Sequence, residues 1–135
     1  MVERKECNNI RVRGIRGAIT VKQNTVEDII TATKELLRAI VLENDLDLEE
    51  IASAFFTLTP DLNAQFPALA ARELGWRCVP LLCAQEIDVP GAAAGVVRVL
   101  VHVNTDKPQK ELKHLYLGDA ARLRPDLSGD VNSEV

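Results

Sequence analysis

The chain has 135 residues, of which 47% are hydrophobic and 27% charged, and its net charge at pH 7 is −4. This length and balance predict one soluble domain with a single hydrophobic core. The acidic charge, the lack of a Lys/Arg cluster and the few aromatic residues argue against a nucleic-acid partner, and no apolar run is long enough to span a membrane.

The chain has three cysteines and two histidines, and their spacing does not match that of metal ligands. We therefore expect no metal site, no disulfide framework and a reducing environment. The N-terminus has no apolar segment followed by a cleavage site, so the sequence predicts a cytoplasmic protein.

The first predicted strand follows a charged segment. Residues 1–9 lack apolar periodicity, which predicts a flexible N-terminal extension. Hydrophobic alternation from Ile10 to Val21 then predicts a strand, in which Gly14 and Gly17 permit a bend or close packing.

A long helix and a buried strand are predicted next. Thr25 is a candidate N-cap, and apolar residues recur at intervals of three and four behind it, which predicts a helix over Val26–Asn44. The apolar run Ile51–Leu58 predicts a buried strand, with Phe55 and Phe56 in the core.

The middle of the chain predicts a short helix and an edge strand. Phe66–Leu74 is rich in alanine and is followed by Gly75, a residue that commonly ends helices. Val79–Ala84 predicts a strand, and Pro80 indicates an edge or a bulge because proline donates no backbone hydrogen bond.

The last predicted elements are a strand over 96–103, a helical turn over 107–112 and a strand over His114–Leu117. Residues 128–135 are acidic and contain Gly and Ser, so we expect a flexible tail after one domain that spans 10–127. Strands separated by helices predict a mixed sheet with helices on one face. Five such strands are too few to close a barrel alone, and oligomerisation would be one way to protect the sheet edges.

Arg98 is the one full charge inside the apolar run 96–103. Strand alternation places it on the face opposite Val97, Val99 and Val101. Because a guanidinium is costly to bury without an anion, we expect an anionic partner beside it. That partner is either an Asp or Glu of the chain or an anionic ligand.

Several short segments follow one another between about Arg11 and Leu127, and their order is more specific than any one of them. The segments are Arg13-Gly14-Ile15-Arg16-Gly17-Ala18, Thr59-Pro60-Asp61-Leu62, Phe66-Pro67-Ala68 with Arg72-Glu73, Cys83-Ala84-Gln85-Glu86, Val97-Arg98-Val99, and His114-Leu115-Tyr116-Leu117 through Leu123-Arg124-Pro125-Asp126-Leu127. Together they resemble the monofunctional chorismate mutases of the trimeric α/β-barrel type.

The resemblance implies an α+β, ferredoxin-like subunit and a homotrimer whose sheets form a pseudo-α/β barrel, with active sites at the subunit interfaces. It also implies the isomerisation of chorismate to prephenate, the branch step of phenylalanine and tyrosine biosynthesis. This rearrangement is intramolecular and pericyclic, so it calls for no cofactor and no metal.

The resemblance assigns catalytic roles to Arg98, Glu86 and Arg16. Arg98 would donate to the breaking ether oxygen and to the side-chain carboxylate, which Arg16 would also bind. Glu86 would accept from the ring hydroxyl and favour the electron-poor ring. The other substrate-binding residues would form walls, donors and a cationic mouth: Arg72, Cys83, Tyr116, Phe66, Ala68, Leu123 and Arg124.

Two positions depart from the family pattern: Leu69 stands where a lysine can occur, and Leu82 where a threonine can. Two other functions remain open, a non-catalytic trimeric module that binds a small dicarboxylate and an imine deaminase of the related trimeric fold. An anion sensor gains nothing from a carboxylate such as Glu86 beside Arg98, and this pairing favours the enzyme.

Overall fold

A computed structural model describes residues 9–122, so the extension before this range and the segment after it lie outside the description. The described residues form one five-stranded sheet in the order β3-β2-β4-β1-β5. Its strands are β1 (Arg11–Thr20), β2 (Ile51–Leu58), β3 (Leu81–Gln85), β4 (Val96–Thr105) and β5 (Leu115–Leu117). The central strand β4 is antiparallel to β1 and β2, whereas the outer strands β5 and β3 are parallel to their neighbours.

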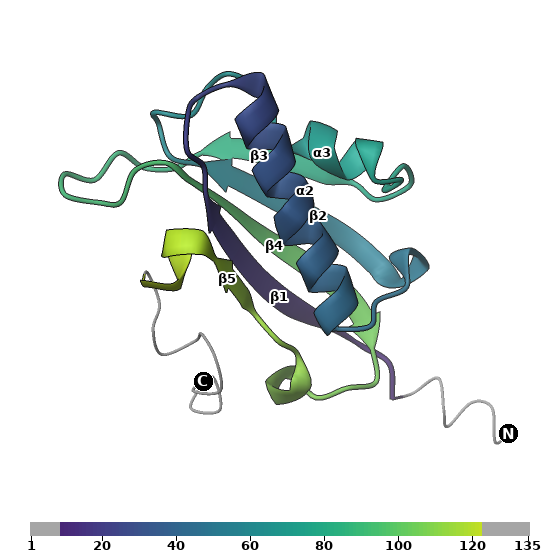
Figure 1. The fold of residues 1–135 in the computed structure, drawn as a ribbon. Helices are drawn as coiled ribbons and strands as arrows, with labels where there is room; N and C mark the ends of the chain where they lie inside the picture. The colour runs from purple at the N-terminus through teal and green to yellow at the C-terminus, as the bar shows by residue number, and fades with distance from the viewer. Residues whose placement is uncertain (1–8, 123–135) are drawn as a thin grey trace, which may run out of the picture.

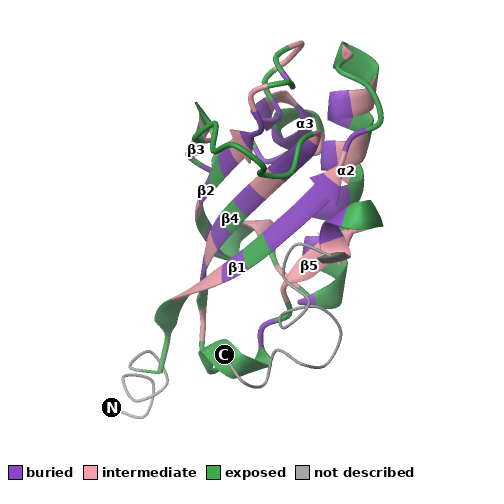
Figure 2. Ribbon diagram, turned by 90° about the vertical axis from the view of Figure 1, so that its left-hand side faces the viewer, coloured by how far each residue is buried: buried purple, intermediate pink, exposed green. Residues whose placement is uncertain are grey.

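Two helices, α2 (Val26–Glu43) and α3 (Ala68–Glu73), lie against the same face of this sheet (Figures 1 and 2). Short 3₁₀ turns at Leu48–Glu50, Gln109–Glu111 and Gly118–Arg122 complete the described part. The predicted α+β class and the mixed sheet with helices on one face are therefore confirmed. No helix within residues 9–122 has the length and hydrophobicity that crossing a membrane requires.

Helix α2 begins where its capping signal predicts. The Thr25 hydroxyl accepts a hydrogen bond from the Asp28 amide at 3.1 Å, which satisfies one of the free donors of the first turn. The helix buries an apolar stripe against the sheet that includes Ile29, Leu36 and Ile40.

Gly17 lets α2 approach β1 closely. A Cβ atom at this position would lie 2.8 Å from Cδ1 of Ile40 and 3.1 Å from Cδ1 of Leu36. The predicted close packing at Gly17 is thus confirmed, and its partner is α2.

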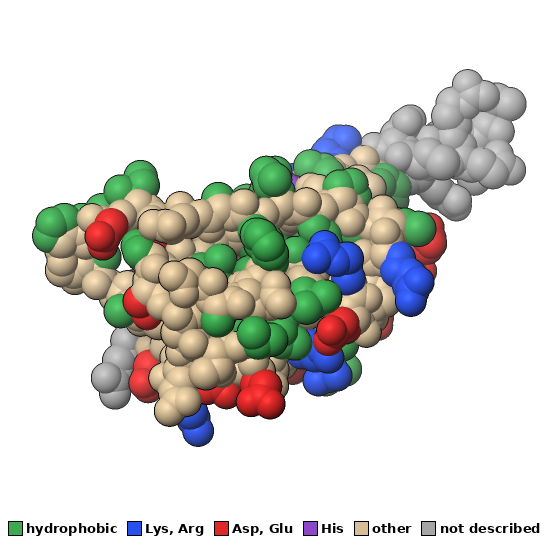
Figure 3. All heavy atoms as spheres, turned by 90° about the horizontal axis from the view of Figure 1, so that it is seen from above, with side chains coloured by type: hydrophobic (Ala, Val, Ile, Leu, Met, Phe, Trp, Pro, Cys, Tyr) green, Lys and Arg blue, Asp and Glu red, His purple; other side chains and the backbone are tan. Residues whose placement is uncertain are grey.

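Strand β3 lies at one edge of the sheet, as Pro80 predicted, and begins directly after that residue. Helix α3 ends before Gly75, whose positive φ of 96° suits glycine. The loop between β3 and β4 projects from the molecule and carries exposed hydrophobic side chains, among them Ile87 and Val89 (Figures 1 and 3).

The two faces of β4 differ as the alternation predicted. Val97, Val99 and Val101 are buried under the helices, and Arg98 lies on the opposite face, which neither α2 nor α3 covers and which we call the helix-free face. Phe55 corrects one prediction, since its side chain is 42% exposed and not in the core. Its strand register places it opposite Leu100 on the helix-free face.

Candidate active site

A carboxylate holds Arg98 on the helix-free face. Nε of Arg98 donates to Oε2 of Glu86 at 2.9 Å, and the two side chains are 37% and 19% exposed. The Thr57 hydroxyl donates to the same Oε2 atom at 2.6 Å. Glu86 directly follows β3, and its backbone amide donates to the Leu58 carbonyl at 2.9 Å.

The guanidinium keeps donors for another anion. Among residues 9–122, the hydrogen bond and ion pair of Arg98 both involve Nε, so its two Nη groups are not engaged. A planar guanidinium with two such groups matches the geometry of a carboxylate. The sequence left two possible anionic partners for Arg98, a carboxylate of the chain or a ligand. The carboxylate is present, and its contact with Nε leaves the Nη groups able to bind an anionic ligand as well.

The strand register brings Arg98 into one row with residues from three other strands. Thr57 of β2 lies opposite Arg98, Ala18 of β1 lies on its other side, and Tyr116 of β5 lies beside Ala18. Ala18 is small and fully buried, and Tyr116 packs against the small cluster that it forms with Val96 and Ala120.

A hollow of about 340 Å³ lies over this row. Its lining includes Arg16, Arg98 and Tyr116, three residues that the sequence analysis assigned to the site. Arg16 is exposed and Tyr116 half-buried, so the charged and phenolic groups face a space open to solvent. We call this space the arginine hollow.

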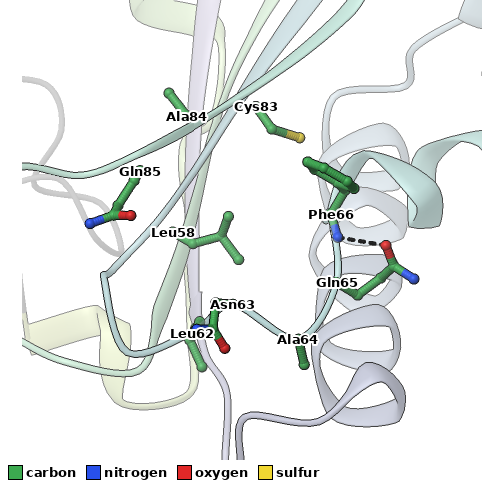
Figure 4. Close-up of a pocket in the computed structure, with 9 residues that line it drawn as sticks. All are labelled: Leu58, Leu62, Asn63, Ala64, Gln65, Phe66, Cys83, Ala84 and Gln85. Atoms are coloured by element: carbon green, nitrogen blue, oxygen red, sulfur yellow. Dashed lines mark hydrogen bonds between the residues drawn. The ribbon is translucent and has the colours of Figure 1, made fainter.

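A second hollow, of about 320 Å³, lies at the β3 edge and is lined in part by Phe66 and Cys83. The Cys83 thiol points toward the Phe66 ring (Figure 4). Burial raises the pKa of Cys83, against smaller opposing effects of a hydrogen bond with the Ala68 backbone and of the Arg72 charge. Phe66 and Cys83 thus line this hollow, which we call the cysteine hollow, and Ala68 and Arg72 lie near Cys83.

The predicted site residues thus fall into two places in one chain. Within the described residues, the linings of the arginine hollow and the cysteine hollow share no residue. Glu86 belongs with the first group through its contact with Arg98. Leu123 and Arg124, which were also predicted, lie outside the described residues.

Thr57 was missed by the sequence analysis. It lines the arginine hollow and donates to Glu86, although it reads in sequence as one more residue of a buried strand. Strand alternation places Thr57 on the same face as Phe55, but the sequence does not show that this face is free of helices, and the contact of Thr57 with Glu86 depends on a register that the sequence does not state.

The two departures from the family pattern lie in different surroundings. Leu69 is half-buried on α3, and Leu82 is 60% exposed on β3. In residues 9–122 no three His, Cys, Asp or Glu side chains are grouped so that they could hold a metal ion.

Arginines and a phenol that line a solvent-open hollow, with a carboxylate fixed beside one of the arginines, are the groups expected of a site for a small anionic molecule. The comparisons with known proteins specify this class. The family model described as chorismate mutase type I matches residues 12–127. The chain therefore belongs to the chorismate mutase type I family.

Named relatives are similar over nearly their whole length. The chain is 47% identical over 125 residues to chorismate mutase AroH of Bacillus subtilis, which covers 92% of this chain and 98% of that protein. It is 53% identical over 117 residues to chorismate mutase AroH of Thermus thermophilus, with 86% and 96% covered. The solved structure of a chorismate mutase from Clostridium thermocellum has a TM-score of 0.79 and 48% identity, and the match covers 81% of this chain and 97% of that one.

Proposed function

We propose that this protein is a chorismate mutase that converts chorismate to prephenate for phenylalanine and tyrosine biosynthesis. It works as a cytoplasmic homotrimer without a cofactor, and its active sites lie at the subunit interfaces. The family membership and the identity to named chorismate mutases support the activity. The proposed mechanism rests on the geometry of Arg98, whose Nε is held by Glu86 while no residue within 9–122 engages its two Nη groups.

The reaction breaks a C–O bond and forms a C–C bond within one dianion. Negative charge accumulates on the ether oxygen in the transition state while the ring becomes electron-poor. A guanidinium fixed in advance at that oxygen stabilises the transition state more than the ground state. Arg98 fills this role, and Glu86 lies beside it, where its carboxylate meets the ring.

The remaining residues bind and orient the substrate. Arg16 neutralises the side-chain carboxylate, and Tyr116, on the neighbouring strand β5, donates a further hydrogen bond. Because the enzyme binds chorismate in its compact conformer, the conformational entropy is lost on binding and no longer adds to the activation barrier.

A trimer accounts for the two separate hollows. The helix-free face exposes Val12, Phe55, Leu82 and Leu100, an apolar set of the kind that subunit contacts cover. If the β3 edge of one subunit packs against the arginine hollow of the next, Phe66, Ala68, Cys83 and Arg72 complete a site that neither chain holds alone. In this arrangement we expect Leu123 to add an apolar wall and Arg124 a positive charge at the mouth of the site.

The activity is tested by following the loss of ultraviolet absorbance of chorismate in the presence of a chelator. The wild-type protein should consume chorismate and form prephenate, and Arg98→Ala should lose at least about a hundredfold in kcat, the typical effect of removing one such donor. Arg38→Ala serves as the matched control, because Arg38 is exposed on α2 away from both hollows. Chorismate that binds without turnover would instead favour a binding module, and imine hydrolysis without mutase activity would favour a deaminase.

A further inference from the structure

We propose that Thr57 is a positioning residue, which holds the Glu86 carboxylate so that both Nη groups of Arg98 remain available to the substrate. The inference rests on the proposed roles of Arg98 and Glu86 and adds a residue that neither the sequence analysis nor the family motifs identified. It is carried by two hydrogen bonds that end on one oxygen atom, from Thr57 at 2.6 Å and from Arg98 at 2.9 Å.

The ion pair has an unusual form for an arginine and a carboxylate. Such pairs are frequently bidentate, with two parallel N–H···O bonds. Here the described contact is single, from Nε of Arg98 to Oε2 of Glu86. A bidentate pair would occupy an Nη group and remove a donor that a dianionic substrate needs.

The Thr57 hydroxyl opposes the change to a bidentate pair. It lies directly across the sheet from Arg98 and donates to the oxygen that Arg98 already uses. Rotation of the carboxylate toward an Nη group would lengthen or break this short hydrogen bond. The described residues make no hydrogen bond to Oε1 of Glu86, so this oxygen stays free for a substrate hydroxyl.

The backbone keeps Thr57 and Glu86 in register. Thr57 belongs to β2, and the carbonyl of the next residue, Leu58, accepts from the Glu86 amide at 2.9 Å. The backbone thus fixes Thr57 on β2 and Glu86 directly after the neighbouring strand β3, so the contact between their side chains requires little further loss of conformational entropy.

The first experiment compares Thr57→Val with Thr57→Ser. Valine has nearly the shape of threonine but cannot donate, and we expect kcat/KM for chorismate to fall by about tenfold, in the range of one hydrogen bond to a charged group. Part of the loss should appear as a raised KM, because the substrate must compete with Glu86 for Arg98. Serine restores the hydroxyl and should keep kcat/KM within about threefold of the wild type.

Thr33→Val is the matched control for the chemical change. Thr33 is buried, whereas Thr57 is half-buried, and the Thr33 hydroxyl also donates a short hydrogen bond, to the Ile29 carbonyl at 2.7 Å. It lies in α2, remote from the arginine hollow. This variant should keep wild-type kcat and KM even if its melting temperature falls. Circular dichroism and thermal melting of every variant separate a loss of folding from a loss of positioning.

The second experiment repeats Thr57→Val in a Glu86→Ala background, assayed at high enzyme concentration. If Thr57 acts through Glu86, its substitution should cost less than about twofold once the carboxylate is gone. Three results would overturn the positioning role. The first is an equal loss in both backgrounds, and the second is a Thr57→Val protein as active as wild type. The third is a folded Thr57→Ser protein as impaired as Thr57→Val. Full activity of Glu86→Ala alone would instead contradict the role proposed for Glu86, so the two failures are distinguishable.

Discussion

Arg98 is a residue whose shape matters as well as its charge. Its Nε donates to Glu86, and we propose that its two Nη groups bind the substrate, a division that needs a planar, forked side chain. Arg98→Lys keeps the positive charge but has a single ammonium group. We expect this variant to lose about a hundredfold or more in kcat, close to the loss in Arg98→Ala.

Steady-state kinetics of both variants check this prediction. A lysine variant within a few fold of the wild type would show that charge alone is sufficient, and the fork geometry would then have no role in the reaction.

Glu86 is predicted to act mainly on the transition state. In the proposed mechanism its carboxylate stabilises a ring that becomes electron-poor only as the bond breaks, so Glu86→Ala should lower kcat by about tenfold or more and change KM less. Michaelis–Menten analysis at constant ionic strength separates the two effects. A rise of KM at constant kcat would make Glu86 a binding residue only.

The Cys83 thiol should resist alkylation. Burial raises its pKa, so it remains protonated at pH values where an ordinary thiol is already partly ionised, and the thiolate is the reactive form. At pH 8 iodoacetamide should therefore modify Cys83 more slowly than exposed Cys78, and the rate at Cys83 should continue to rise at higher pH. Peptide mass spectrometry measures the two rates, and equal rates at pH 8 would contradict the prediction.

At the scale of elements, the contact between β1 and α2 depends on the absence of a side chain at Gly17. Gly17→Ala would place a Cβ atom 2.8 Å from Ile40, and the resulting overpacking should lower the free energy of unfolding by about 1–3 kcal/mol. Gly14→Ala is the matched control on the same strand, since its Cβ would meet Leu100 at an ordinary 3.5 Å.

Chemical denaturation at one fixed protein concentration measures both variants. Equal stability of Gly17→Ala and Gly14→Ala would show that α2 can shift without cost and that the close approach is not required.

The elements were largely predictable because their signals are local. Periodicity and the Thr25 cap located α2 to within one residue at its end, and Pro80 correctly indicated that β3 is an edge strand. The direction in which Phe55 points was not predictable in the same way. Alternation separates the two faces of a strand, but which face the helices cover is decided by tertiary packing.

The contact between Thr57 and Glu86 is the part of the site that could not be predicted from the sequence. Arg98 and Glu86 could be identified from motifs, whereas their pairing with Thr57 depends on the registers of β2 with β3 and β4. The β2–β4 register shifts between Ile51 and Ser53, so counting residues from the strand start would misplace the partners. Long-range pairing of this kind is a property of the folded sheet.

At the scale of the whole molecule, the proposed active site is divided between chains. In the proposed trimer one subunit would supply the arginine hollow with Arg16, Arg98 and Tyr116, and the next would supply the cysteine hollow with Phe66 and nearby Arg72. Variants that damage different hollows should therefore complement each other in a mixed trimer. Variants that damage the same hollow should not.

The most direct test is to co-refold equal amounts of Arg98→Ala and Arg72→Glu and to assay the mixture below the wild-type KM. Each variant alone should be nearly inactive, and random assembly should restore about a quarter of the wild-type activity, since one site in four combines two intact hollows. A mixture of Arg98→Ala with Arg16→Ala is the control, and it should stay inactive. Activity of the first mixture no higher than the mean of its two components would contradict a site shared between subunits.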